Sequence, residues 1–489
     1  MTEDIRDRKG AVLFVYEHGD HKATYQLLEL AQPDDSVTVP VKENTVRQPP
    51  IDKLHHELLV AIFDAARRRP PFEDDMDDDE IPTLEVISHV SRHWRHIVLG
   101  VPYFWTDLVI KLERPLDKLF AYLERSQQCQ LYITLENCSA VSKEKTLAVL
   151  DSITMYKDRW RQFVLKPHED TDIHLISSYL SEKCSFPNLQ CLRLFLPYNP
   201  PAPETPPPQW SWFSFCSGLS TLELYIHRLQ TRPTVSQFRT LVKSSPCLEN
   251  LTLVGEVFDL MPDHGHATIE IPSLTSLSIG TGTAENVYFG LLLQLLSTPA
   301  LEALELWSLD NDGWSIFRNT VDVESKKYPN LKSLALVEVD FDNKDDEIGG
   351  WLASAFPMLQ HLTLLEDEDD RQDCFSDIVI RFLHLLCCPA PPSPGSHDQA
   401  SPTIWQYLHT LTISDTCDSE LLRDMLISRA AVGHPISMLQ LDPDIKLHFV
   451  STSGKGIQAL VLVEDFCKEL VYPWNTQPRH WNYRMNTNV

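Results

Sequence analysis

A short apolar pattern recurs along most of this chain and constrains its fold more than any other feature. Eight segments carry L-x-x-L-x-L, some with Ile in the last position, and six of them place a proline two residues before the first leucine. Their last apolar positions are Leu194, Leu224, Leu253, Ile279, Leu306, Leu336, Leu364 and Ile413. The steps are 26 to 30 residues, except for the last, which is 49. The alternation within each segment predicts a strand with one buried face.

The pattern continues in both directions and alternates with helices. Ile110, Leu135 and Leu165 precede it and Leu441 follows it, at steps of 25 to 30 residues. Helical spacing of apolar residues appears between strands, over 116–124, 143–156, 286–296, 378–386 and 420–427. A strand and a helix repeated at this period are typical of leucine-rich repeats, in which stacked units bury one shared core.

We therefore expect an α/β fold in which residues 106–442 form a leucine-rich-repeat solenoid of about twelve units. Its curved parallel β-sheet would lie on the concave face and its helices on the convex face. Pro-rich stretches 197–208 and 387–403 interrupt the repeat and predict surface loops, the second explaining the long final step. Doubly wound and barrel α/β folds also alternate strands with helices, but they need no fixed sequence period.

Residues 48–105 do not follow the repeat and form a separate helical segment. One predicted helix places Leu54, Leu58, Leu59, Ile62 and Phe63 on a single face. After an acidic insertion over 73–80, a second apolar face carries the residues Ile87, Val90, Trp94 and Ile97. Amphipathic faces of this kind predict helices that pack together or dock on a partner.

This segment resembles the F-box motif, in the version found in large families of fungal F-box proteins with leucine-rich repeats. That motif opens Leu-Pro-x-Glu-Leu-Leu with a following Ile-Phe, and continues with His-Val-Cys-Arg-x-Trp-Arg and Pro-x-Leu-Trp. Here residues 54–63 read LHHELLVAIF, residues 89–95 HVSRHWR and residues 102–105 PYFW. His55 stands where the family has proline, which removes a rigid helix start. The resemblance covers this motif closely and the rest of the chain by architecture.

The resemblance implies a substrate-recruiting adaptor of an SCF-type cullin–RING ubiquitin ligase, which is not itself an enzyme. F-box helices dock on a Skp-type adaptor, which links them to the cullin. The adaptor-binding residues expected here are Leu54, Leu58, Leu59, Ile62, Phe63, Ile87, Val90, Trp94 and Ile97. The same helices could instead only cap the open end of the solenoid, which would make the chain a protein-interaction scaffold without ligase association.

A protein substrate is expected on the concave face, where side chains between the inward leucines point outward. The expected substrate-binding residues are Arg193, Phe195, Glu223, Tyr225, Glu305, Trp307 and His361. Phosphorylated motifs are usually held by arginine clusters. Because this face offers one arginine, we expect an unphosphorylated partner. The aromatic side chains could alternatively pack against the Pro-rich loops or the C-terminal residues.

The remaining sequence argues against several other classes of function. A formal net charge of -27 disfavours nucleic-acid binding. We find no signal peptide, no span long enough for a membrane, no catalytic motif, no metal-ligand spacing and no cofactor fingerprint. We therefore expect an intracellular protein, cytoplasmic or nuclear, without a cofactor. Residues 1–47 receive no assignment, and residues 443–489 are expected to form a C-terminal cap or tail.

Overall fold

A computed structural model describes most of the chain between residues 50 and 471. The described residues are 50–67, 83–112, 115–136, 142–167, 170–183, 185–196, 210, 216–226, 232–260, 268–281, 286–321, 327–339, 348–365, 377–387, 404–413, 419–441 and 469–471. The N-terminal segment 1–47, the acidic insertion 73–80 and the loop 197–208 lie outside them, as does all of 387–403 except Cys387 and all but three residues of 443–489. Two compact units are present, Met1–Leu54 and His55–Val489. In the first, the structure describes the 3₁₀ helix η1 (Pro50–Lys53) and Leu54.

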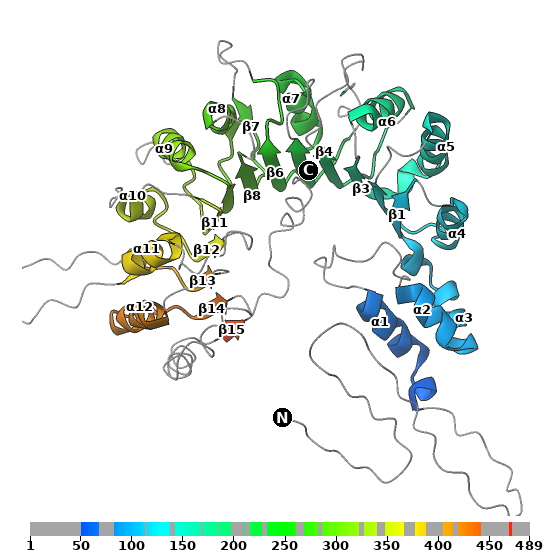
Figure 1. Ribbon diagram of the computed structural model, residues 1–489, viewed down its shortest axis with the longest axis horizontal. Helices are drawn as coiled ribbons and strands as arrows, with labels where there is room; N and C mark the ends of the chain where they lie inside the picture. The colour runs from blue at the N-terminus through cyan, green and yellow to red at the C-terminus, as the bar shows by residue number, and fades with distance from the viewer. Residues whose placement is uncertain are drawn as a thin grey trace, which may run out of the picture. The chain divides into compact units, whose positions relative to one another are not determined.

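The second unit is an α/β structure in which strands and helices alternate (Figure 1). Its strands are β1 (Asp107–Lys111), β2 (Leu131–Glu136), β3 (Trp160–Lys166), β4 (Cys191–Leu196), β5 (Thr221–Ile226), β6 (Asn250–Gly255), β7 (Ile269–Glu270), β8 (Ser276–Gly280), β9 (Leu296–Ser297), β10 (Ala303–Trp307), β11 (Ser333–Val337), β12 (His361–Leu365), β13 (Thr410–Ile413), β14 (Met438–Leu441) and β15 (Glu469–Val471). Its helices are α1 (His56–Arg67), α2 (Thr83–Val90), α3 (Arg92–Gly100), η2 (Pro102–Trp105), α4 (Asp117–Arg125), α5 (Lys143–Thr154), η3 (Lys157–Arg159), α6 (Asp170–Lys183), α7 (Val235–Ser244), α8 (Asn286–Leu295), α9 (Asn311–Thr320), α10 (Ile348–Ala355), α11 (Asp377–Leu386) and α12 (Ser419–Ala431).

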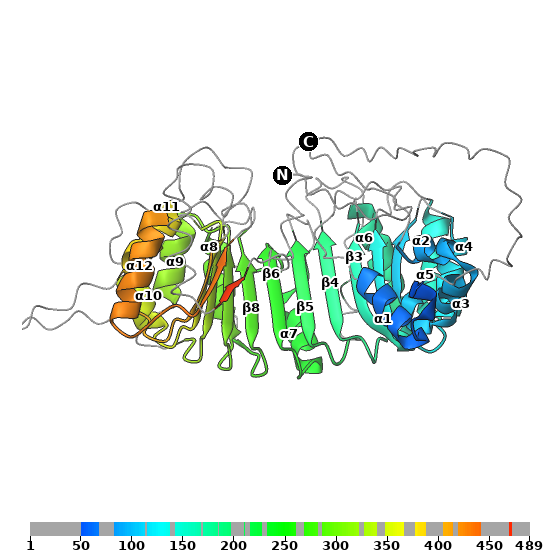
Figure 2. The same cartoon turned by 90° about the horizontal axis from the view of Figure 1, so that it is seen from below.

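One long parallel sheet runs through this unit. Among the described residues it has 13 strands, from β1 at one edge to β15 at the other, while β7 and β9 pair separately. Apart from those two short strands, every strand follows its neighbour in chain order, as the side-by-side strands in Figure 2 show. A doubly wound sheet would reverse its strand order and a barrel would join its edge strands. The observed strand order therefore fits a solenoid-like arrangement, and it fits neither a doubly wound sheet nor a barrel.

The repeated leucines meet in one row across the sheet. The last apolar residue of each predicted strand is paired in register with that of the next, from Ile110 and Leu135 through to Ile413 and Leu441. The twelve predicted strands are thus confirmed. The sequence did not predict β15, which pairs with β14 from within the segment expected to be a cap.

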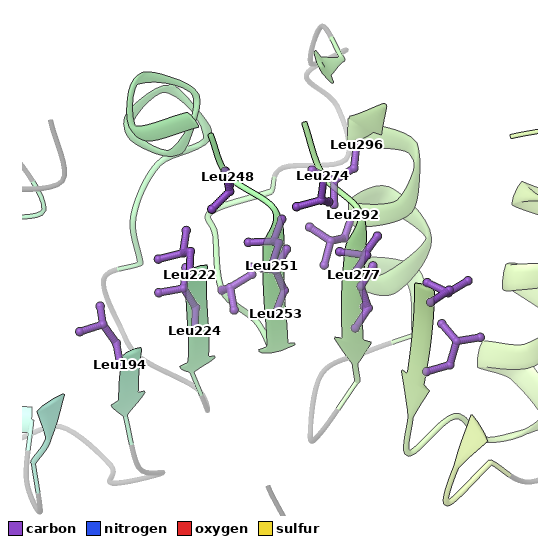
Figure 3. Packing of buried hydrophobic residues seen from close by; sticks show 14 of the residues in the cluster. Leu194, Leu222, Leu224, Leu248, Leu251, Leu253, Leu274, Leu277, Leu292 and Leu296 are labelled. Atoms are coloured by element: carbon purple, nitrogen blue, oxygen red, sulfur yellow. The ribbon is translucent and has the colours of Figure 1, made fainter. Parts of the chain in front are cut away.

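The core lies between the sheet and the helices that cover its outer side. Side chains of the leucine rows are buried together with those of the helices in one continuous cluster. In Figure 3, Leu222, Leu251 and Leu277 from neighbouring strands lie on the side of the sheet that also holds Leu292 of α8. Burying apolar surface at about 25 cal/mol per Å² is the main stabilising contribution. Because each unit shares its core with its neighbours, the fold needs the whole stack.

Helices α1 to α3 pack as a group and join the first repeat through aromatic contacts. Ser91 follows α2 and caps α3, since its hydroxyl accepts a hydrogen bond from the Trp94 backbone N–H at 3.1 Å. The indole of Trp105 donates to the Val98 carbonyl at 3.0 Å and meets the Tyr122 ring of α4 edge-on at 4.9 Å. An ion pair between Arg67 and Asp107 links α1 to β1. These three helices are therefore continuous with the start of the sheet.

Close packing of α8 against α9 depends on Gly290. A Cβ atom at this position would lie 2.7 Å from Cγ2 of Ile316. Gly290→Ala should therefore lower the free energy of unfolding by about 1 kcal/mol, because an overpacking cost of about 1–3 kcal/mol exceeds the gain of about 1 kcal/mol in helix propensity. Gly350→Ala in α10 is the control, because its Cβ would meet nothing within 4 Å. Thermal unfolding of both variants tests this, and equal stabilisation by both would contradict it.

Candidate protein-interaction surfaces

Helices α1 and α2 each expose a pair of apolar side chains one helical turn apart. Leu58 and Ile62 of α1 are 55% and 46% exposed. Val86 and Val90 of α2 are 50% and 59% exposed. Residues at i and i+4 lie on the same face of a helix, so each pair forms a short apolar strip. We call these four residues the exposed apolar pairs.

The predicted adaptor-binding residues divide into two groups that the sequence did not separate. Leu54, Leu58, Ile62 and Val90 are exposed, and Trp94 is half-buried against Phe63 with ring centroids 4.9 Å apart. Four others are buried in the core shared by the helices: Leu59, Phe63, Ile87 and Ile97. The expectation that these four contact a partner directly is wrong, because their side chains are already packed inside the folded protein.

Val86 belongs to the exposed group but was missed from the sequence. It precedes Val90 by one helical turn, a spacing that would have identified it. The predicted docking face instead included Ile87, which is buried in the helical core. Choosing between these neighbours requires knowing which side of α2 faces α1 and α3.

A basic hollow of about 440 Å³ lies along α3. It is lined by Arg92, Arg95, His96, Leu99 and Gly100. Both arginines are exposed. In a chain whose formal net charge is -27, a surface that combines two arginines with an exposed leucine favours acidic, partly apolar contacts.

The inner face of the sheet, opposite the helices, carries an apolar row near the ends of the strands. Phe195, Tyr225, Val254, Gly280 and Trp307 follow one another in register from β4 to β10. The rings of Phe195 and Tyr225 stack with centroids 4.5 Å apart and planes at 7°. They form a cluster separate from the main core, with Trp307 packed against it.

Three of the predicted substrate-binding residues are not open to solvent. Phe195, Tyr225 and Glu223 are buried, which corrects the expectation that these side chains meet a partner on an open surface. Glu223 instead pairs with Arg193, whose Nε lies 3.0 Å from Oε1 of the carboxylate. Parallel pairing places side chains of adjacent strands at the same level, which makes both the ring stack and the ion pair possible.

Glu305 lies in the same row of the inner face as Arg193 and Glu223. Burial is the main cause that raises the pKa of the Glu305 carboxyl, and the negative charge of Glu223 raises it further. The side chains of Ser278 and Trp307 partly oppose this shift. Because the carboxyl is poorly solvated, it is less suited to attract a cationic partner than an exposed glutamate.

An open pocket of about 510 Å³ lies on the inner face where β11 to β14 run side by side. Its lining is polar and contains no arginine, lysine, aspartate or glutamate: Ser333, His361, Thr363, His409, Thr410, Thr412, Ser437, Met438 and Gln440. Of the predicted substrate-binding residues, His361 lines this pocket. None of the predicted substrate-binding residues lies in β13 or β14, and the register places the outward side chains of these strands beside His361.

Two imidazoles stand together in this pocket. The rings of His361 and His409 meet edge-on with centroids 4.7 Å apart. Burial and then the nearby His409 lower the pKa of His361, so the neutral form is favoured near pH 7. Nδ1 of His409 lies 3.0 Å from Oγ1 of Thr410, and the Thr412 hydroxyl donates to Oε1 of Gln440 at 2.8 Å. The second of these contacts links side chains of the adjacent strands β13 and β14.

Two other kinds of site are absent from the described part of the chain. It contains no group of three or more His, Cys, Asp or Glu side chains placed to hold a metal ion. None of the described helices is long and apolar enough to cross a membrane. The surfaces that remain as candidates are the exposed apolar pairs and the inner face of the sheet.

Comparison with known proteins adds little to this description. No protein-family model matches the chain, and no curated protein matches its sequence. Among solved structures, the chain is similar to a crystal structure of a protein from Bacteroides fragilis, with a TM-score of 0.30 and 14% sequence identity. That similarity covers 69% of this chain and 74% of the other. A likeness of this strength identifies neither a fold family nor a function.

Proposed function

We propose that the chain is an F-box protein with leucine-rich repeats that recruits a protein substrate to an SCF-type ubiquitin ligase. Helices α1 to α3 would bind the Skp-type adaptor, and the inner face of the repeat sheet would bind the substrate. No residue of this chain would perform bond chemistry. Its contribution would be proximity, which raises the effective concentration of the substrate at the ligase.

The observation that carries this proposal is the set of exposed apolar pairs. Leu58 and Val90 fall within the two stretches that resemble the F-box motif, and both are more than half exposed. The same helices already bury a core of their own, so the exposed residues are not needed to complete it. Large apolar side chains grouped on a surface favour a protein partner.

A second candidate is a leucine-rich-repeat scaffold without ligase association. The contacts of Trp105 with Tyr122 and of Arg67 with Asp107 favour it, because they attach α1 to α3 to the first repeat as a cap would be attached. Capping by itself leaves the exposed apolar pairs without a role. We therefore rank the adaptor role above the scaffold role.

Co-purification with a Skp-type adaptor tests the proposal. The full chain and the adaptor would be co-expressed, purified through a tag on the chain and separated by size-exclusion chromatography. We expect a complex of equal stoichiometry that also retains the cullin when it is added. If the folded chain elutes alone in the presence of excess adaptor, the ligase role is wrong and the scaffold role replaces it.

A further inference from the structure

The open part of the inner face lies at β11 to β14 and not at the aromatic row. Phe195 and Tyr225 are buried and stacked on each other, whereas the pocket of about 510 Å³ is bounded by strands that present polar side chains. In Figure 1 these strands, coloured yellow to orange, form the C-terminal part of the sheet. A ligand for this face therefore finds hydrogen-bonding groups in this pocket.

The pocket is lined by uncharged side chains, most of which can donate a hydrogen bond to a ligand. Gln440 uses its carbonyl oxygen to accept from Thr412, so its amide N–H groups are the part left for a ligand. One of these groups points to the sulfur of Met438, a weak acceptor. Within the described residues, His361 makes a ring contact with His409 and its ring nitrogens make no hydrogen bond. The hydroxyls of Ser333 and Thr363 add further donors to the lining.

The charge of the lining is also unusual for this protein. The whole chain carries 69 Asp and Glu against 42 Lys and Arg, yet the pocket contains neither kind of residue. A carboxylate accepts hydrogen bonds and cannot donate them, so it suits a site that has available donors and no competing acid. Hydrogen bonds to an ionised acceptor are roughly twice as strong as those between neutral groups.

We propose that this pocket binds an acidic side chain, an aspartate or glutamate, of the recruited protein. The inference rests on the proposed substrate-binding role of the inner face, and it does not require that α1 to α3 bind an adaptor. His361, the amide of Gln440 and the nearby hydroxyls hold the carboxylate. His409 positions the ring of His361 through their edge-on contact, and Thr412 positions the Gln440 amide.

A phosphate is a poorer fit for the same donors. Phosphorylated motifs are usually bound by arginine or lysine, which balance a charge of nearly two. The lining offers neither. A lysine or arginine of the partner would find no carboxylate with which to pair. A single negative charge is therefore the ligand chemistry that the pocket suits best.

Direct peptide binding tests this inference. The probes are four fluorescein-labelled Gly/Ser peptides that differ only in two adjacent central residues, which are glutamate, glutamine, phosphoserine or lysine. Fluorescence anisotropy is measured with the full chain at pH 7. We expect the glutamate peptide to bind about tenfold more tightly than the glutamine peptide, since hydrogen bonds to a charged group are stronger than those between neutral groups. The phosphoserine and lysine peptides should bind more weakly than the glutamate peptide.

Variants identify the residues responsible. His361→Gln and Gln440→Leu should each weaken binding of the glutamate peptide about tenfold. His384→Gln is the matched control, because His384 is exposed on α11 and should leave binding unchanged. Circular dichroism and thermal unfolding verify that each variant is folded, and two independent variants guard against the failure of one.

Several outcomes would overturn the inference. These are no binding of the glutamate peptide at millimolar concentration, equal binding of the glutamate and glutamine peptides, preference for phosphoserine or lysine, or full affinity in both folded pocket variants. The result is separate from the adaptor test. If the chain binds no adaptor but prefers the glutamate peptide, the ligase role is wrong and the inference about the pocket stands. If it binds the adaptor but shows no preference for the glutamate peptide, the ligase role stands and the inference about the pocket is wrong.

Discussion

The double substitution Leu58→Asp and Val90→Lys is expected to abolish binding to the Skp-type adaptor. Each residue would lose an apolar contact and place a charge in a desolvated interface. Central interface residues contribute about 2 kcal/mol or more apiece, so the pair should weaken binding on the order of a thousandfold. Isothermal titration calorimetry with purified adaptor measures the loss directly.

The fold should survive this double substitution. Leu58 lies in the first turn of α1, where a negative charge interacts favourably with the helix dipole, and Val90 ends α2, where a positive charge does. Both side chains are more than half exposed, and such surface changes usually alter stability by less than about 0.5 kcal/mol. Retention of the wild-type melting temperature would show that the loss belongs to the interface.

A matched control separates adaptor docking from general surface chemistry. Val287, in the first turn of α8, is 59% exposed, and Ile427 is exposed in the second half of α12. Val287→Asp with Ile427→Lys makes the same chemical changes among the repeats and should leave adaptor affinity intact. If both double variants bind as the wild type does, the exposed apolar pairs are not the docking surface.

Arg429→Met is expected to destabilise the C-terminal repeats by about 3–5 kcal/mol. The guanidinium of Arg429 is fully buried and donates to four backbone carbonyls, at distances of 2.8 to 3.5 Å: those of Ile404, Trp405, Leu408 and His434. Methionine retains much of the side-chain volume and removes every donor. Four carbonyls would then lose a partner, and each buried unsatisfied group costs about 1–3 kcal/mol before relaxation.

Hydrogen exchange is the appropriate measurement for this variant. A repeat stack can open locally, so one global unfolding energy does not describe it well. Backbone amides of β13, α12 and β14 should exchange on the order of a hundredfold to a thousandfold faster, while those of β1 to β5 keep their protection. Arg423→Met on the same helix is the control, because Arg423 is partly exposed and pairs with the adjacent Asp424. Equal protection in the two variants would contradict this role of Arg429.

The sequence predicted the repeating fold because the pattern that marks each strand is local and recurs many times along the chain. In each strand, the alternation of apolar and polar residues shows which face is buried. Twelve such strands at nearly constant spacing make the prediction of a repeat stronger than any one strand could. The same local pattern placed most boundaries of the five predicted repeat helices within two residues, as for 143–156 against Lys143–Thr154. It missed β15, where a strand of three residues carries too little pattern to stand out.

The functional surfaces were predicted less well. The sequence of a helix shows which of its faces is apolar, but it does not show whether that face packs inside the protein or binds a partner. From sequence alone, Leu58 and Leu59 were equivalent members of the predicted docking surface. Packing of α1 against α2 and α3 buried Leu59 and left its neighbour exposed. Likewise, Phe195 and Tyr225 alternate as outward residues should, yet both are buried and stacked on each other in the folded protein.

The sequence by itself thus determined the parallel strand–helix repeat and which leucines form its core, since periodicity is a property of the chain. Tertiary structure alone decided which outward side chains remain accessible. It placed His361 beside His409, although matching positions of their two repeats are 49 residues apart in the sequence. It also placed Gln440 of the next strand, β14, in the same pocket. Accessibility and convergence depend on neighbours distant in sequence, whose positions become fixed when the units stack.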